Sequence, residues 1–173
     1  MSTATLVLLA VTAALGLLLT AVEERVRSPW GAVLLPVLLA VAAGLAWTGR
    51  PAATGLVHMG TAVGVLTAVL AGGPVATAVL RAADPTNAAL AGGPGDPEVL
   101  RGGAWVGVLE RGAVAVTLLA GWPEGLAVLV AVKGLGRYAE LKAPAAAERF
   151  IIGTLASVLW AAACVGCVVL LAR

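Results

Sequence analysis

The feature that most constrains this chain is a succession of long apolar runs separated by short polar links. A helix needs ~20 consecutive, mainly apolar residues to cross the hydrocarbon core of a bilayer, and several runs reach that length. The chain is 61% hydrophobic and 12% charged, whereas soluble domains carry ~25% charged residues. The sequence therefore predicts an all-α, polytopic transmembrane helix bundle, a single domain over residues 1–173 embedded in a cell membrane.

About six spans fit between the polar links. They are expected at residues 3–22, 30–48, 54–80, 102–121, 124–141 and 148–171. Gly72-Gly73-Pro74 predicts a break in the third span, because Pro lacks the backbone N–H that a helix interior uses. Beyond it, residues 75–80 either complete the crossing after a kink or lie along the membrane interface. Residues 81–98 are rich in Asp, Pro and Gly and are expected to form a polar cytoplasmic loop.

The distribution of basic residues indicates how the bundle is oriented. The first, third and fifth links are flanked by Arg25, Arg27, Arg81, Arg101, Lys142 and Arg149. Only Arg50 and Arg173 flank the opposite ends. Because cytoplasmic loops carry an excess of Lys and Arg, both termini are expected outside.

The stretch from Arg101 to Thr154 differs from the rest because its apolar spans carry ionisable residues. A charge at the centre of a membrane helix costs on the order of 3 kcal/mol, so such residues are usually paired or line a site. The candidates for a ligand or ion pathway are Glu110, Arg111, Lys133, Arg137, Glu140 and Glu148. This stretch is therefore the predicted functional region.

The register of a helical hairpin predicts how these charges meet. A turn at Trp122-Pro123 places Glu110 level with about residue 135, between Lys133 and Arg137. We therefore expect Glu110 to pair with one of these two basic residues. Arg137 and Glu140 would extend the network toward the cytoplasm. Arg111 would point ~100° away from its neighbour on the same helix.

Two interpretations of these charges stay open. Ionisable residues inside a membrane mark solute or ion pathways, which favours a small transporter or channel-like protein. Buried ion pairs can also fix the register of neighbouring helices, which would suit a non-catalytic membrane scaffold or partner subunit. Removing the charges separates the two, because only the first predicts a change in solute flux.

Small residues indicate where helices approach each other. Gly103 and Gly107 lie four residues apart on the fourth span, and Gly153 and Ser157 form a similar stripe on the sixth. Small residues at this spacing let helix backbones come close, within one bundle or between subunits. The sequence therefore predicts helix-packing faces, and a homo-oligomer or a membrane partner protein.

The last 70 or so residues resemble an uncharacterised bacterial family of multi-pass integral membrane proteins. The resemblance rests on a Leu-Glu-Arg helix, a helix with Lys and Arg, and a Glu followed by an Ile-Gly-Thr segment. The matching residues are Leu109, Glu110, Arg111, Lys133, Arg137, Glu148, Ile152, Gly153, Thr154 and Ser157. It implies that the charged residues belong to a recurring unit, and it implies no known activity.

Cys164 and Cys167 form a C-x-x-C pair, a spacing found in redox and metal sites. The pair lies in an apolar run without a second cysteine pair, and thiols in apolar surroundings are ordinarily inert. A membrane thiol oxidoreductase is therefore a third and weaker interpretation.

The sequence does not indicate other chemistry. It contains no Gly-rich phosphate loop with its Lys and no His-rich metal motif, so we expect no metal and no cofactor. We also expect no enzymatic activity, with an acid or base role for Glu110 on lipid as a minor alternative. The net charge of +2 is small and no basic cluster is long, which argues against nucleic acid as a partner.

Overall fold

The structure is a computed structural model that describes residues 2–22, 30–83, 103–142 and 144–173. Within these ranges the chain is helical, with no strand. The α-helices are α1 (Ser2–Val22), α2 (Trp30–Thr48), α3 (Thr54–Ala83), α4 (Gly103–Leu119), α5 (Gly125–Gly136) and α6 (Pro144–Ala172). A short 3-10 helix, η2 (Glu140–Lys142), precedes α6. The predicted all-α fold is confirmed.

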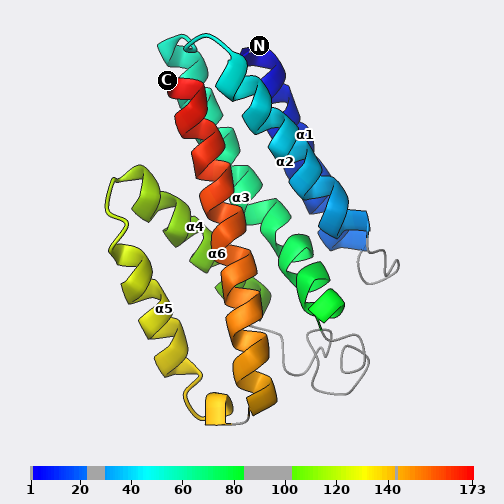
Figure 1. The fold of residues 1–173 in the computed structure, drawn as a ribbon, viewed down its shortest axis with the longest axis vertical. Coiled ribbons are helices and arrows are strands. Elements are labelled where there is room, and N and C mark those ends of the chain that lie inside the picture. Colours follow the sequence, from blue (N-terminus) through cyan, green and yellow to red (C-terminus); the bar gives the residue numbers. More distant parts are fainter. Residues whose placement is uncertain (1, 23–29, 84–102, 143) are drawn as a thin grey trace.

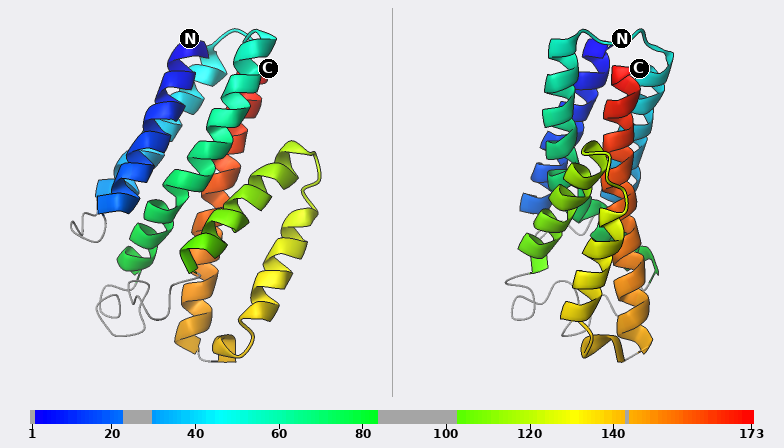
Figure 2. Two further views of the ribbon diagram at one scale, coloured as in Figure 1. Left: turned by 180° about the vertical axis from the view of Figure 1, so that it is seen from behind. Right: turned by 90° about the vertical axis from the view of Figure 1, so that its left-hand side faces the viewer.

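Four long helices and one short hairpin make up the molecule (Figure 1). α1, α2, α3 and α6 lie side by side, and both termini are at the same end. α3 is central, because it contacts α1, α2, α4 and α6. The hairpin of α4 and α5 leans against this bundle, and its turn stops short of the end that carries the termini (Figure 2).

Three of the helical segments are long and apolar enough to cross a membrane. They are Ser2–Ala21, Thr54–Ala83 and Ala146–Ala172. The apolar parts of α2 and α5 are shorter, at Val33–Thr48 and Gly125–Gly136. α4 has 17 residues and is about 26 Å long, a little less than the ~30 Å hydrocarbon core. Six complete spans therefore stay a prediction.

The break expected in the third span is wrong, since α3 runs through Gly72-Gly73-Pro74 to Ala83. Pro74 cannot donate to the carbonyl of Leu70, and its ring crowds that turn. One residue before that carbonyl, Arg111 Nε of α4 donates to the carbonyl oxygen of Val69 at 3.0 Å, which joins α4 to α3 beside this turn. Membrane helices tolerate Pro when they pack against neighbouring helices.

Two other boundaries differ from the expected spans. α5 ends at Gly136 rather than residue 141, because two glycines in its last turn weaken the helix and Arg137 N–H bonds back to Gly134 at 3.2 Å. α6 begins at Pro144 rather than residue 148, since Pro is well suited to the first position of a helix. Of the expected loop at 81–98, residues 81–83 end α3 and the remainder lies outside the described residues.

The turn predicted at Trp122-Pro123 is present and has a defined geometry. Gly121 has a φ of +70°, the left-handed conformation that Gly adopts without steric cost. Trp122 N–H donates to Thr117 O at 3.0 Å, and Gly121 N–H donates to Leu118 O at 3.1 Å. These two bonds form a Schellman motif, which ends α4 and reverses the chain into α5.

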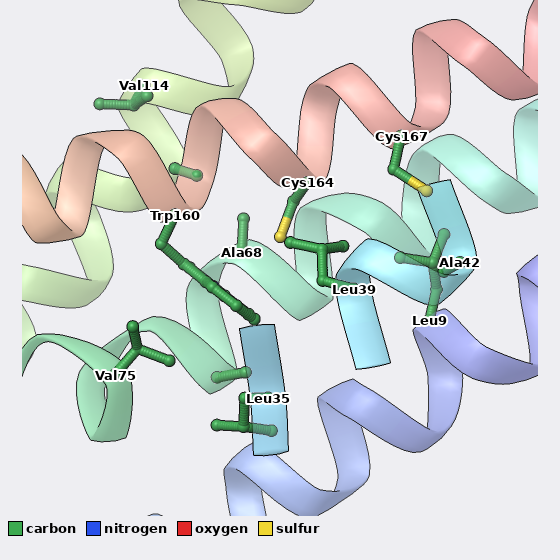
Figure 3. Packing of buried hydrophobic residues seen from close by; sticks show 12 residues of the cluster. Leu9, Leu35, Leu39, Ala42, Ala68, Val75, Val114, Trp160, Cys164 and Cys167 are labelled. Carbon is green, nitrogen blue, oxygen red and sulfur yellow. The ribbon is translucent and has the colours of Figure 1, made fainter. Parts of the chain in front are cut away.

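The buried core lies among the four long helices (Figure 3). It is formed by Leu9, Leu35, Leu39, Ala42, Ala68, Ala71, Val75, Trp160, Ala161, Cys164 and Cys167, with Val114 from α4 at its edge. The Trp160 ring extends from α6 toward Leu35 of α2. Its Nε1 donates to the carbonyl oxygen of Thr67 at 3.3 Å, which fixes α6 against α3.

Close helix contacts in this bundle depend on glycine. A Cβ on Gly16 of α1 would clash with the backbone of Ala71 in α3, and a Cβ on Gly64 would clash with Val168 of α6. At Gly60 it would lie 2.6 Å from Leu171 Cδ2. These glycines give the bundle the backbone approach that small residues allow in membrane helices.

Candidate functional site

The centre of the candidate site is an ion pair between the two helices of the hairpin. Lys133 Nζ of α5 lies 2.7 Å from Oε1 and 2.6 Å from Oε2 of Glu110 in α4. The side chains are 20% and 11% exposed, respectively. The hairpin register placed Glu110 beside Lys133 or Arg137, and the structure pairs it with Lys133.

The pair is bordered by α6 through an aromatic ring. Lys133 Nζ lies 5.5 Å from the centroid of the Phe150 ring, within the range of a cation–π contact. The ammonium therefore meets a carboxylate on α4 and an aromatic face on α6. Because both charged side chains keep some exposure, the pair lies at the border of the packed region and not in the apolar core.

Arg111 points away from this pair, as the helical geometry predicts. It is 6% exposed and is directed at α3, where its Nε bonds to Val69 O. Its aliphatic stem passes over Gly72, since a Cβ there would clash with Arg111 Cδ and lie 2.8 Å from Trp160 Cδ1. The Gly-Gly step in α3 therefore makes room for the arginine.

The end of the guanidinium lies where three helices meet. A Cβ added to Gly107 of α4 would be 3.1 Å from Arg111 Nη1. One added to Gly73 of α3 would be 3.8 Å from Nη2 and 3.7 Å from Cγ2 of Thr20 in α1. Thr20 belongs to the last turn of α1, so this cation lies near the end of that apolar helix.

Three other predicted site residues lie toward the ends of their helices. Arg137 is exposed and caps the C-terminus of α5, and Glu148 is exposed near the start of α6. Glu140 belongs to η2, and its side chain lies outside the description. The predicted extension of the network through Arg137 and Glu140 therefore stays a prediction. Nearby, Lys142 Nζ lies 5.7 Å from the centroid of the Tyr138 ring.

The four residues predicted to pack helices together have different surroundings in the structure. Gly153 of α6 faces Leu80 of α3, with 3.2 Å between an added Cβ and Leu80 Cδ1. Gly107 makes room for the guanidinium of Arg111. Ser157 is buried in α6 and its hydroxyl has no hydrogen-bond partner among the described residues, which is also true of Thr154. Gly103 is the first residue of α4.

Cys164 and Cys167 are free thiols, fully buried in the core. Figure 3 shows the Cys164 sulfur directed toward Leu39 of α2. Within the part of the chain that the structure describes, no group of three His, Cys, Asp or Glu residues could hold a metal ion. This surrounding favours a packing role for the two cysteines, because a reactive thiol needs access and a polar environment.

An apolar groove of about 600 Å³ lies between α2, α3 and α6. Its wall residues include Pro36, Leu39, Val75, Leu159 and Trp160. The Trp160 ring also touches Gly72, beside the stem of Arg111. The groove therefore shares one side chain with the surroundings of the charged cluster, but its lining is hydrocarbon.

The groups around Lys133 and Arg111 that are not ionisable could not be found from the sequence. Phe150 and Gly72 gave no signal of a site, although Phe150 is the single Phe of the chain and lies close to the predicted hairpin of the fifth and sixth spans. The carbonyl of Val69 is a backbone group, which the pattern of side chains cannot reveal.

The chain matches no known protein-family model, and comparisons with curated proteins and with solved structures give no match. The function of the site is therefore inferred from its geometry and chemistry.

Proposed function

We propose that the protein is a small, polytopic membrane transporter whose solute site is formed by Glu110, Lys133 and Arg111. The observation that supports this most is the placement of all three on one short hairpin, at the border of an otherwise apolar bundle. Ionisable residues in such surroundings are costly and mark pathways for charged solutes or ions.

The exposure of the pair supports access from the water side. Glu110 and Lys133 are partly exposed, while the core residues behind them are closed to solvent. α5 has 12 residues, about 18 Å of helix, so it is shorter than the hydrocarbon core of a bilayer. A short hydrophobic segment is accommodated by local thinning of the bilayer, which brings water toward the charges.

The proposed arrangement in the membrane has six helices and both termini outside. Arg81 near the end of α3, and Lys142 and Arg149 near the start of α6, lie at the end opposite the termini. The excess of basic residues at that end assigns it to the cytoplasm. The charged cluster then opens toward the cytoplasmic half, and lipid, together with a second copy or a partner protein, covers the outward faces.

A membrane scaffold or partner subunit is the second candidate, and a specific observation favours it. Both oxygens of Glu110 are engaged by Lys133, and Arg111 bonds to the backbone of α3. These contacts fix how the hairpin sits on the bundle, and ion pairs of this kind can serve packing alone. The resemblance predicted for this region implies no known activity, so it does not favour either candidate.

Flux measured in liposomes tests the proposal. Purified full-length protein is reconstituted with a pH-sensitive dye and an imposed membrane potential, and the wild type is compared with Glu110→Gln. Transport predicts flux of a proton, cation or anion in the wild type and a strong reduction in the variant, which must remain folded. Glu124→Gln is the matched control, because Glu124 is an exposed acid at the hairpin turn.

The scaffold alternative predicts a different pattern. Neither protein would conduct any of the solutes, while Glu110→Gln would unfold at a lower temperature than the wild type and Glu124→Gln would not. That result would overturn the transport proposal.

A further inference from the structure

The hydrogen-bonding capacity of Arg111 is only partly used inside the protein. A guanidinium carries five N–H donors and stays charged in proteins. The bond from Nε to Val69 O at 3.0 Å uses one of them. Nη1 and Nη2 find no acceptor among the described residues, although the side chain as a whole is only 6% exposed. Neither atom is among the fully buried side-chain atoms that lack a partner, so their four N–H donors stay open to a group that approaches from outside the bundle.

The nearest carboxylate does not supply that acceptor. Both oxygens of Glu110 lie within 2.7 Å of Lys133 Nζ. Glu110 contributes one negative charge, and Lys133 and Arg111 contribute two positive charges, so the three together carry an excess of one positive charge. The cluster is therefore complementary to one further anionic group.

The position of the guanidinium indicates where that group comes from. Nη1 and Nη2 lie against Gly107 and Gly73, with the methyl group of Thr20 beside them. Thr20 is one residue from the end of the apolar segment Ser2–Ala21. In the proposed arrangement, the end of this segment lies where the hydrocarbon of a bilayer gives way to phosphate headgroups and water.

We infer that Arg111 is the binding residue for an oxyanion of the phosphate class, held by Nη1 and Nη2 between α1, α3 and α4. The planar fork of a guanidinium matches two phosphate oxygens, which an ammonium group cannot do. The phosphate is carried either by a membrane lipid headgroup or by a dissolved solute. This inference rests on the proposed transport function and names the substrate class of its site.

Binding to the purified full-length protein in a neutral detergent tests the inference. One arm uses inorganic phosphate with chloride at equal ionic strength as the reference. The other uses a short-chain phosphatidylglycerol with an uncharged short-chain glyceride as the reference. Saturable binding of either phosphate probe, seen as a rise in the unfolding temperature above its reference, is the expected result, and the responding arm identifies the source.

Two variants show whether Arg111 is responsible. Arg111→Lys keeps the charge but loses the fork, and its dissociation constant for the probe is expected to rise about tenfold. Gly107→Ala keeps the arginine and presses on Nη1, so weaker binding is expected there even if Arg111→Lys fails to fold. Gly134→Ala, which adds a methyl group in open space, should bind like the wild type.

The results that overturn the inference differ from those that overturn transport. No binding of either probe to the wild type, or equal binding to the wild type and Gly107→Ala, would refute a phosphate site at Arg111. Cation flux in liposomes would still stand in that case. Phosphate binding without any flux would support the site and refute transport.

Discussion

Two parts of the molecule differ in the side chains that they contain. One is the bundle of α1, α2, α3 and α6, and the other is the hairpin of α4 and α5. The bundle is closed by glycine, alanine and cysteine contacts, and its core holds a single aromatic ring, Trp160. The hairpin adds Val114 to that core, with Leu118, Leu126 and Leu129 packed against it, and it also carries the ion pair and the buried arginine. Close helix packing is therefore concentrated in the four-helix bundle, and the charged side chains are concentrated in the hairpin.

The contact between the two parts combines apolar packing with one polar bond. Arg111 of α4 bonds to the backbone of Val69 in α3, Val114 is part of the core, and Leu118, Leu126 and Leu129 pack against it. The hairpin is therefore held by one polar bond and by apolar packing. The variants below weaken one part at a time.

The largest effect is expected at Gly16 in the bundle. A Cβ there would clash with the backbone of Ala71, which no side-chain rotation can relieve, so Gly16→Ala should lower the free energy of unfolding by about 3 kcal/mol. Gly44→Ala in α2 is the matched control, because its Cβ meets nothing within 4 Å. Unfolding midpoints in detergent measure both. Equal stability of the two variants would show that α1 and α3 are less closely packed than described.

A smaller effect is expected at the ion pair of the hairpin. Glu110→Gln or Lys133→Met alone leaves a partly buried charge without its partner and should cost about 2 kcal/mol, less than for a fully buried pair. The double variant should recover much of this loss, since the two residues contact each other directly. A double-mutant cycle on unfolding free energies gives the coupling. Strictly additive losses would contradict the pairing.

The smallest effect is expected at the core thiols. Cys164→Ser places a hydroxyl among apolar neighbours and should cost about 1 kcal/mol. In the folded wild type, maleimide should leave Cys164 and Cys167 unmodified, since both are buried. The two thiols should react once a denaturing detergent unfolds the protein. Leu135→Cys on the hairpin, where the native side chain is 74% exposed, should react at once. Rapid labelling of the native thiols would revive the redox interpretation.

The sequence predicted the helices well, because apolar runs and polar links mark them directly. It also predicted that Glu110 meets Lys133 or Arg137, since helical pitch and one turn fix which residues are level, and the structure shows Lys133. The same reasoning directed Arg111 away from the pair. The helices and the relative positions of residues within one hairpin could therefore be predicted from the sequence.

What could not be predicted depends on contacts between distant segments. α3 continues past Pro74, and Arg111 bonds to Val69 because the fold brings α4 beside that turn. Phe150 of α6 meets Lys133 of α5, a contact between two helices that the residue pattern of either one does not reveal. Both features depend on tertiary contacts.

The central position of α3 has a consequence for how the protein is made. α3 is synthesised before α4, α5 and α6, yet its glycine face at Gly60 and Gly64 is filled by Leu171 and Val168 from the far end of α6. Until α6 has been made, that face has no cover, and the carbonyl of Thr67 lacks the indole N–H of Trp160. The fold is thus completed by its last helix, and a chain interrupted before α6 would leave Gly60 and Gly64 uncovered.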